Sequence, residues 1–143
     1  MHANREPRQL QFPPVLGMEM EASRAASDIA EQHQMSVEKI VDVSAAVLEA
    51  FLNVLERGNP NSGPITLTVE VIGDENRETL QISVGDTTAG RRAERIDVAH
   101  SADQPAAAQK SGWGLKLIER LTDETKVTSD GEGTTITMSK RCH

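Results

Sequence analysis

Residues 36–58 read SVEKIVDVSAAVLEAFLNVLERG and form the longest clean helical pattern in the chain. At about 100° per residue, the apolar side chains of this segment fall within one stripe, which predicts an amphipathic helix packed on a core. Ser36 is suited to the N-cap, and Glu38 in the first turn favours the helix dipole. The stripe consists of Ile40, Val43, Val47, Phe51 and Val54.

Two polar side chains lie on the other face of this predicted helix. Glu49 points about 180° away from the middle of the stripe, and Asn53 follows one turn later. A carboxylate and an amide at this spacing are neighbours, and together they can hold a hydrated Mg²⁺ and orient a hydroxyl. The alternative is an ordinary solvated face, because Glu38, Asp42 and Glu56 share the same side.

Composition limits the classes of protein to consider. The chain has 143 residues and a formal net charge of −7, which predicts one acidic domain and argues against direct nucleic-acid binding. The single cysteine, Cys142, rules out an internal disulfide and a multi-cysteine metal site. No apolar run approaches the roughly 18 residues of a membrane span, and no export signal is visible. We therefore expect a cytoplasmic protein that has no membrane or direct nucleic-acid partner.

The order of the predicted elements indicates the fold class. We expect an N-terminal disordered tail, residues 1–9, and a single domain over residues 10–141. The order strand, helix, helix, two strands, connection, helix, two strands predicts an α+β fold. This fold is a two-layer sandwich of a mixed, mostly antiparallel sheet with about three helices on one face. The expected strands are centred on Leu10–Phe12, Ile65–Val71, Leu80–Val84, Thr125–Ser129 and Thr134–Met138.

The connection over residues 87–110 has no sustained pattern. Structureless connections longer than about 12 to 15 residues are usually functional or disordered, so we interpret this one as a lid over a ligand. Arg91, Arg92 and Arg95 lie in the lid and either reach a β- or γ-phosphate or form a solvated cluster.

Two further pieces of sequence are typical of nucleotide sites. Gly112, Trp113 and Gly114 are expected to open the helix after the lid, where backbone N–H groups and the helix dipole suit a phosphate. Two glycines one residue apart are also common in ordinary loops. Asp86 ends an apolar strand, where it either accepts a hydrogen bond from an exocyclic amine such as that of adenine or caps a turn.

Taken together and in this order, these pieces resemble the GHKL or Bergerat-fold ATPase domain shared by gyrase, heat-shock chaperones, sensor histidine kinases and mismatch-repair proteins. The resemblance covers nearly the whole chain. The segments VLEAFLNVLERG and SGWGLKLIERLTDETKVTSDGEGTTITM look most like the anti-sigma factor serine-protein kinases of bacteria. A histidine kinase is a less favoured interpretation, because no phosphoacceptor helix hairpin precedes the domain in this sequence.

The resemblance implies a role for each matched residue. Glu49 matches the general base that acts on a seryl or threonyl hydroxyl, and Asn53 matches the asparagine that binds Mg²⁺. Asp86 matches the aspartate that reads adenine, and Thr134 matches a threonine that supports this contact. The positions matched to the nucleotide-binding glycines are Gly90, Gly112 and Gly114, with Trp113 between the last two.

The implied function is that of an ATP- and Mg²⁺-dependent anti-sigma factor. It would bind a sigma factor and phosphorylate an anti-anti-sigma antagonist of the STAS type on Ser or Thr, as a homodimer. Thr88 departs from the family, which normally has glycine two residues after the aspartate. This departure keeps an alternative open: a non-catalytic or weakly catalytic nucleotide-binding module that regulates a phosphatase or another partner protein. A third interpretation is the same fold without bound nucleotide.

Overall fold

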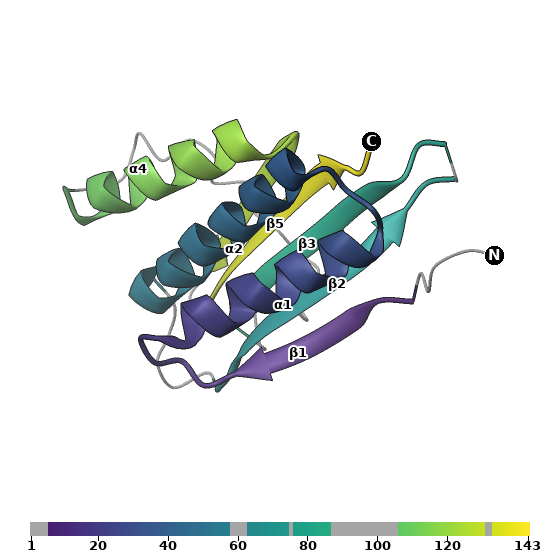
Figure 1. The fold of residues 1–143 in the computed structure, drawn as a ribbon. Coiled ribbons are helices and arrows are strands. Elements are labelled where there is room, and N and C mark those ends of the chain that lie inside the picture. The colour runs from purple at the N-terminus through teal and green to yellow at the C-terminus, as the bar shows by residue number, and fades with distance from the viewer. Residues whose placement is uncertain (1–5, 58–62, 75, 87–105, 131–132) are drawn as a thin grey trace.

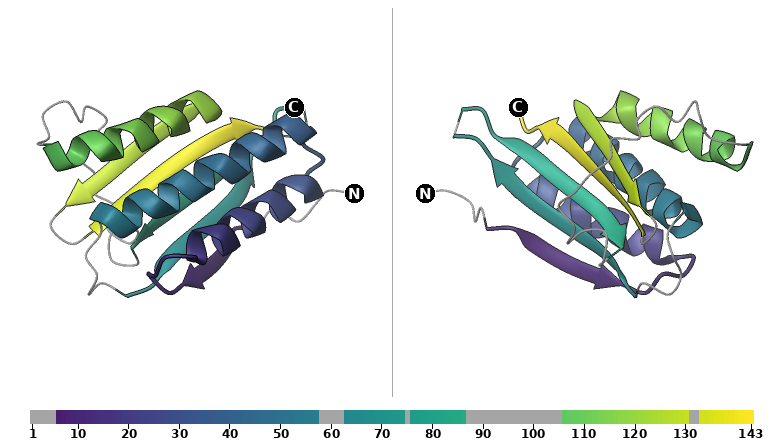
Figure 2. Two further views of the ribbon diagram at one scale, coloured as in Figure 1. Left: turned by 60° about the vertical axis from the view of Figure 1, so that its left-hand side comes forward. Right: turned by 180° about the vertical axis from the view of Figure 1, so that it is seen from behind.

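The computed structural model describes residues 6–57, 63–74, 76–86, 106–130 and 133–143. The protein is a two-layer α+β sandwich in which three helices cover one face of a five-stranded sheet (Figure 1). The opposite face carries no helix among the described residues, as the rear view in Figure 2 shows. The predicted fold class is confirmed, and each strand pairing in the described sheet is antiparallel.

The strands are arranged in the order β1-β2-β3-β5-β4. β1 (Arg8–Phe12) pairs with β2 (Ile65–Ile72), which forms a hairpin with β3 (Thr79–Asp86). β5 (Gly133–Arg141) lies between β3 and β4 (Glu124–Asp130). Apolar residues alternate with polar ones along these strands, so one face packs under the helices and the other remains polar.

Three helices form the second layer: α1 (Met18–Gln32), α2 (Val37–Arg57) and α4 (Ala106–Leu121). α2 lies between α1 and α4 over the sheet (Figures 1 and 2). Its N-cap is the predicted one, because the Lys39 N–H donates to Ser36 Oγ at 3.2 Å. Across the described residues, no helix combines the length and the apolar character that crossing a membrane requires.

The core is almost entirely aliphatic. The predicted stripe of α2 is buried at Val43, Val47, Phe51 and Val54 and partly buried at Ile40. Each buried side chain of this size is worth roughly 1.5–3 kcal/mol relative to an exposed one, so this face secures α2 to the sheet.

Two boundaries differ from the sequence-based expectation. β1 begins at Arg8, so it includes the last residues of the tail expected over residues 1–9. α4 begins at Ala106, so the lid expected over residues 87–110 overlaps the start of this helix. The helix begins early because residues 106–108 are all alanine, which has the highest helix propensity. Residues 1–5 and 87–105 lie outside the described part of the chain.

Candidate functional site

The two polar residues of α2 predicted from the sequence lie beside α4. Asn53 is 4% exposed, and its Oδ1 atom is buried with no hydrogen-bond partner among the described residues. Glu49, one turn earlier, is partly exposed. A buried oxygen without a donor costs about 1–3 kcal/mol, so it is rare in folded proteins and calls for an explanation.

α4 brings Gly114 directly against this pair. A Cβ atom added at Gly114 would lie 2.8 Å from Asn53 Nδ2 and 3.0 Å from Glu49 Oε1. A side chain at position 114 would therefore displace one or both of these polar groups. The structure thus brings together three of the residues predicted from the sequence: Glu49, Asn53 and Gly114.

The glycines of α4 do not open the helix. Gly112 and Gly114 lie well inside α4, which starts at Ala106, so the predicted start of the helix is wrong. The free N–H donors of a helix lie in its first turn. The N–H groups of Gly112 and Gly114 lie beyond that turn and are therefore not among them. A glycine inside a helix costs about 1 kcal/mol relative to alanine, and close packing against Glu49 and Asn53 explains this choice at Gly114.

Asp86 and Thr134 lie at the same edge of the sheet. Asp86 is the last residue of β3, and the preceding Gly85 pairs with Thr135 of β5. Thr134 is 1% exposed, and its Oγ1 lies 3.2 Å from Ser129 Oγ. The two residues matched to adenine contacts therefore come from the ends of neighbouring strands.

A series of contacts places this sheet edge under the C-terminal half of α2. Phe51, two residues before Asn53, packs edge-on against Phe12, with ring centroids 5.9 Å apart. Phe12 pairs with Ile65 across β1 and β2. Ile65 in turn pairs with Asp86 across β2 and β3. These contacts place the ends of β3 and β5 that carry Asp86 and Thr134 on the same side of the molecule as the C-terminal half of α2.

Several positions selected from the sequence fall outside what the structure describes. The side chains of Asp86 and Trp113 are not among the described groups. The same holds for the whole of residues 87–105, which contain Thr88, Gly90 and the lid arginines. The contacts assigned to these residues by resemblance stay predictions.

Sequence reasoning missed Gly85. A Cβ atom there would overlap Thr135 Oγ1 and would lie 2.9 Å from both the Thr134 carbonyl oxygen and Thr135 Cα. The signal was present, because a glycine inside a strand pattern often marks a close approach of another backbone. Gly85 lets β5 pack tightly beside the end of β3.

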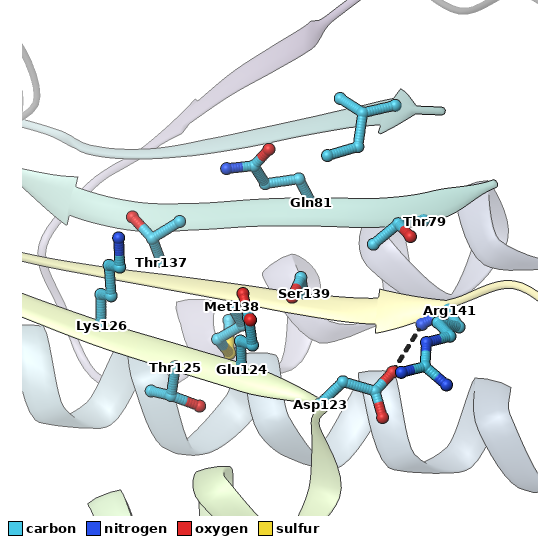
Figure 3. Close-up of a pocket in the computed structure, with 11 residues that line it drawn as sticks. Thr79, Gln81, Asp123, Glu124, Thr125, Lys126, Thr137, Met138, Ser139 and Arg141 are labelled. Atoms are coloured by element: carbon cyan, nitrogen blue, oxygen red, sulfur yellow. Dashed lines mark hydrogen bonds between the residues drawn. The ribbon is translucent and has the colours of Figure 1, made fainter. Parts of the chain in front are cut away.

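A hollow of about 370 Å³ lies on the sheet face that carries no helix (Figure 3). Its lining is mainly polar and includes Gln81 of β3, Lys126 of β4, and Thr137 and Arg141 of β5. Because α2 and α4 cover the other face, this hollow is separate from the group formed by Glu49, Asn53 and Gly114.

The fold and the residues of the site define a class of protein. Residues 16–140 match the family described as histidine kinase-like ATPase domain. This class has the α+β sandwich found here, and the match covers all three helices, the strands β2, β3 and β4, and β5 as far as Lys140. The protein is thus an ATPase-type domain of the GHKL superfamily, as the sequence predicted.

Curated relatives narrow the class. The anti-sigma F factor of Clostridium acetobutylicum is 33% identical over 121 residues, which cover 80% of this chain and 79% of that protein. The anti-sigma F factor of Thermoanaerobacter sp. strain X514 is 29% identical over 126 residues, which cover 83% and 82% of the two chains. The chain belongs to the anti-sigma factor serine-protein kinase family.

Solved structures share the fold. The RsbU and RsbW domains of Rv1364c from Mycobacterium tuberculosis match with a TM-score of 0.67 and 20% identity, over 97% of this chain and 33% of that chain. This chain therefore spans about a third of the length of that crystallised chain. The SiaB–SiaC complex from Pseudomonas aeruginosa matches with a TM-score of 0.53 and 14% identity, over 94% and 89% of the two chains. At these identities, the similarity supports the fold alone.

Proposed function

We propose that this protein binds Mg-ATP between α2 and α4 and transfers the γ-phosphoryl group to Ser or Thr of an anti-anti-sigma antagonist of the STAS type. The observation that carries the proposal is the buried Oδ1 of Asn53, which has no hydrogen-bond partner in the described part of the chain and lies beside Glu49 and Gly114. Mg²⁺ prefers oxygen ligands and is commonly held by one or two protein groups together with phosphates. Asn53 offers such an oxygen, so the residues present fit a magnesium-bound nucleotide.

Within the described residues, Asn53 is the proposed protein ligand of the metal ion. No cluster of three or more His, Cys, Asp or Glu in the described ranges could hold a metal ion. We propose that the phosphates and water supply the other ligands, as is usual for Mg²⁺, so that metal and nucleotide binding are interdependent. Bound Mg²⁺ supplies neutralisation of the phosphate charge, which phosphoryl transfer requires.

Glu49 is proposed as the general base. It accepts the proton of the attacking seryl or threonyl hydroxyl as the hydroxyl oxygen bonds to the γ-phosphorus. The bond from that phosphorus to the β,γ-bridging oxygen breaks, and its electron pair leaves with ADP. Glu49 is partly exposed and one turn from Asn53, so an antagonist can approach it.

The remaining matched residues are proposed to hold the nucleotide. Asp86 and Thr134, from the ends of β3 and β5, read the adenine. By resemblance, Gly90, Gly112 and Trp113 contribute to the contacts with the phosphates and the lid. Gly114, because it has no side chain, leaves Glu49 and Asn53 in place to face the phosphates. Glu49 and Asn53 then mark the reactive end of the nucleotide.

We also propose that the sigma factor docks on the outer surface of α1 and α2. Val37 and Val41 lie one turn apart at the start of α2 and are 77% and 58% exposed. Exposed acidic residues on these helices include Glu21, Asp28 and Glu31 of α1 and Glu38 of α2. This acidic surface complements a basic DNA-binding partner. We further propose that the protein works as a homodimer in the cytoplasm.

A phosphoryl-transfer assay tests the kinase activity. The protein is incubated with γ-labelled ATP, Mg²⁺ and the antagonist from the same cell. Wild type labels Ser or Thr, whereas Glu49→Gln loses transfer by about 100- to 10,000-fold and still binds Mg-ADP. The matched control, Glu38→Gln, removes an acid from the start of α2 and keeps transfer. Binding of ATP without transfer by wild type would contradict the kinase and favour a non-catalytic module.

Affinity capture from the source cell tests the docking surface. Wild type should recover an RNA polymerase sigma subunit, and the double variant V37D/V41E should lose it while its Mg-ADP affinity is unchanged. Leu117→Glu places a charge on a partly exposed apolar position of α4 and serves as the control. Equal recovery by V37D/V41E and wild type would show that the sigma factor binds elsewhere.

A further inference from the structure

A lysine joins three elements at the end of the α2–α4 pair that lies away from the candidate site. Lys140 Nζ, on β5, donates to the Leu121 carbonyl oxygen at 2.7 Å and to Asp42 Oδ2 at 3.0 Å. Leu121 is the last residue of α4, and Asp42 lies on α2. One ammonium group therefore ties both helices to the sheet. We call this set, Lys140 with Asp42 and Leu121, the lysine clamp.

A lysine is unusual at a position as buried as 140. Ile136 and Met138 precede Lys140 on the same face of β5 and are fully buried in the core. The Lys140 side chain is only 13% exposed, and a lysine in such surroundings is costly unless it is paired. The carboxylate of Asp42 and the negative end of the α4 dipole supply this pairing. Since an apolar residue would often be at least as stable, a role in specific positioning is the better explanation.

The spacing along the two helices links the clamp to the candidate site. Asp42 precedes Glu49 by seven residues on α2. Gly114 precedes Leu121 by seven residues on α4. Seven residues of helix are about two turns, or roughly 10 Å. At one end of this two-turn interval, the clamp joins Asp42 to Leu121. At the other end, Gly114 lies against Glu49.

The two helices therefore run antiparallel with matched register, side by side over the sheet (Figures 1 and 2). Thr122 Oγ1 donates to the Ile118 carbonyl oxygen at 2.8 Å, which closes the end of α4 on itself. The Asp123 N–H donates to the Ser139 carbonyl oxygen at 2.8 Å, which joins the following residue to β5. Neither bond reaches α2, whereas Lys140 reaches it through Asp42.

We propose that Lys140 is a positioning residue for the nucleotide site. It fixes α4 along α2 and thereby sets how closely Gly114 approaches Asn53 and Glu49. Its effect on nucleotide affinity rests on the proposed function, but its effect on α4 does not. The two effects are therefore measured separately.

The test uses three variants of the full chain. Lys140→Met keeps the length and the apolar stem but removes the charge and the donors, and Lys140→Arg keeps the charge. Lys126→Met removes the same charge from the sheet face without helices and serves as the matched control. Hydrogen exchange of the Leu115–Leu121 amides is measured without nucleotide, relative to the β3 amides. Calorimetry then gives the Kd for Mg-ADP.

Lys140→Met should speed exchange in α4 about tenfold relative to β3, because the helix end loses its anchor. Its Kd for Mg-ADP should rise about tenfold, the scale at which groups that orient a metal ligand usually act. Lys140→Arg should restore both values to within about threefold of wild type, and Lys126→Met should leave both unchanged.

Two results would overturn the proposal. Unchanged relative exchange in Lys140→Met would show that Lys140 does not anchor α4. Faster exchange with an unchanged Kd would show a purely structural role, whatever happens to the melting temperature. If wild type binds no Mg-ADP, the proposed function fails and the positioning role fails with it, whereas the exchange result still decides whether the clamp holds α4.

Discussion

The two ends of the α2–α4 contact differ in how their polar groups are satisfied. At one end, the Lys140 ammonium has both an anion and a carbonyl oxygen within 3.0 Å. At the other end, Asn53 Oδ1 is buried with no partner among the described residues, and Gly114 leaves no space for a side chain. Folding alone favours satisfied polar groups, and departures are expected at functional sites. The comparison therefore separates an end that holds the helices from an end suited to a ligand.

Replacing Asn53 should give the largest difference between an effect on ligand binding and an effect on stability. We expect Asn53→Ala to weaken Mg-ADP binding about 100-fold, because the proposed metal ligand is lost. The free energy of unfolding without nucleotide should change by less than about 1 kcal/mol, since removing a buried oxygen without a described partner offsets the packing that the truncated side chain loses. Calorimetry in the presence of Mg²⁺ or of EDTA measures the affinity for ADP, and urea denaturation measures the free energy of unfolding. Asn76→Ala, on an exposed turn, is the control. Unchanged affinity together with a large loss of stability would assign Asn53 to the fold instead.

Two glycines allow the roles of stability and ligand binding to be compared further. Gly85 is the glycine that we expect to matter for stability. A Cβ atom at Gly85 would meet backbone atoms of Thr134 and Thr135 at 2.9 Å, and these cannot move without disturbing the ladder between β3 and β5. We expect Gly85→Ala to lower the free energy of unfolding by about 1–3 kcal/mol, as overpacked sites do. Urea denaturation measures this change. A stability equal to wild type would mean that β5 shifts freely.

Gly114 should behave in the opposite way. Its Cβ atom would meet only the ends of the Asn53 and Glu49 side chains, which can rotate away. Alanine also favours the helix by about 1 kcal/mol, so Gly114→Ala should keep or slightly raise stability. Displacing the two polar groups should weaken Mg-ADP binding about tenfold, the size expected when a metal ligand loses its orientation. Full affinity in this variant would show that the nucleotide does not use this approach of α4 to α2.

The sequence predicted those parts of the fold that are set by local patterns. The stripe of α2 and its Ser36 cap follow from residues within a few turns of one another, and the hairpins follow from alternation. The start of α4 was missed because residues 87–110 show no sustained apolar pattern and the glycines predicted the opening of the helix, whereas the alanines from Ala106 onward extend it.

The sequence predicted which residues form the site, but not that they contact one another. Glu49 and Asn53 were selected from their spacing on one helix face and Gly114 from the glycines before an apolar helix, but their contact joins segments far apart in the chain. Lys140 left a local signal, since it continues the inward alternation of β5. Its partner Asp42 is 98 residues away, so no periodic pattern could identify the clamp.

The smallest expected effect lies on the sheet face without helices. Thr137 Oγ1 is 3.1 Å from Ser83 Oγ, and both hydroxyls are only partly buried. Thr137→Val loses this bond next to solvent, so we expect a change of less than about 0.5 kcal/mol in stability. Mg-ADP affinity, measured by calorimetry, should be unchanged because the sheet separates Thr137 from α2 and α4. If this variant weakened nucleotide binding as Asn53→Ala does, the hollow in Figure 3 would be the better candidate for the nucleotide site.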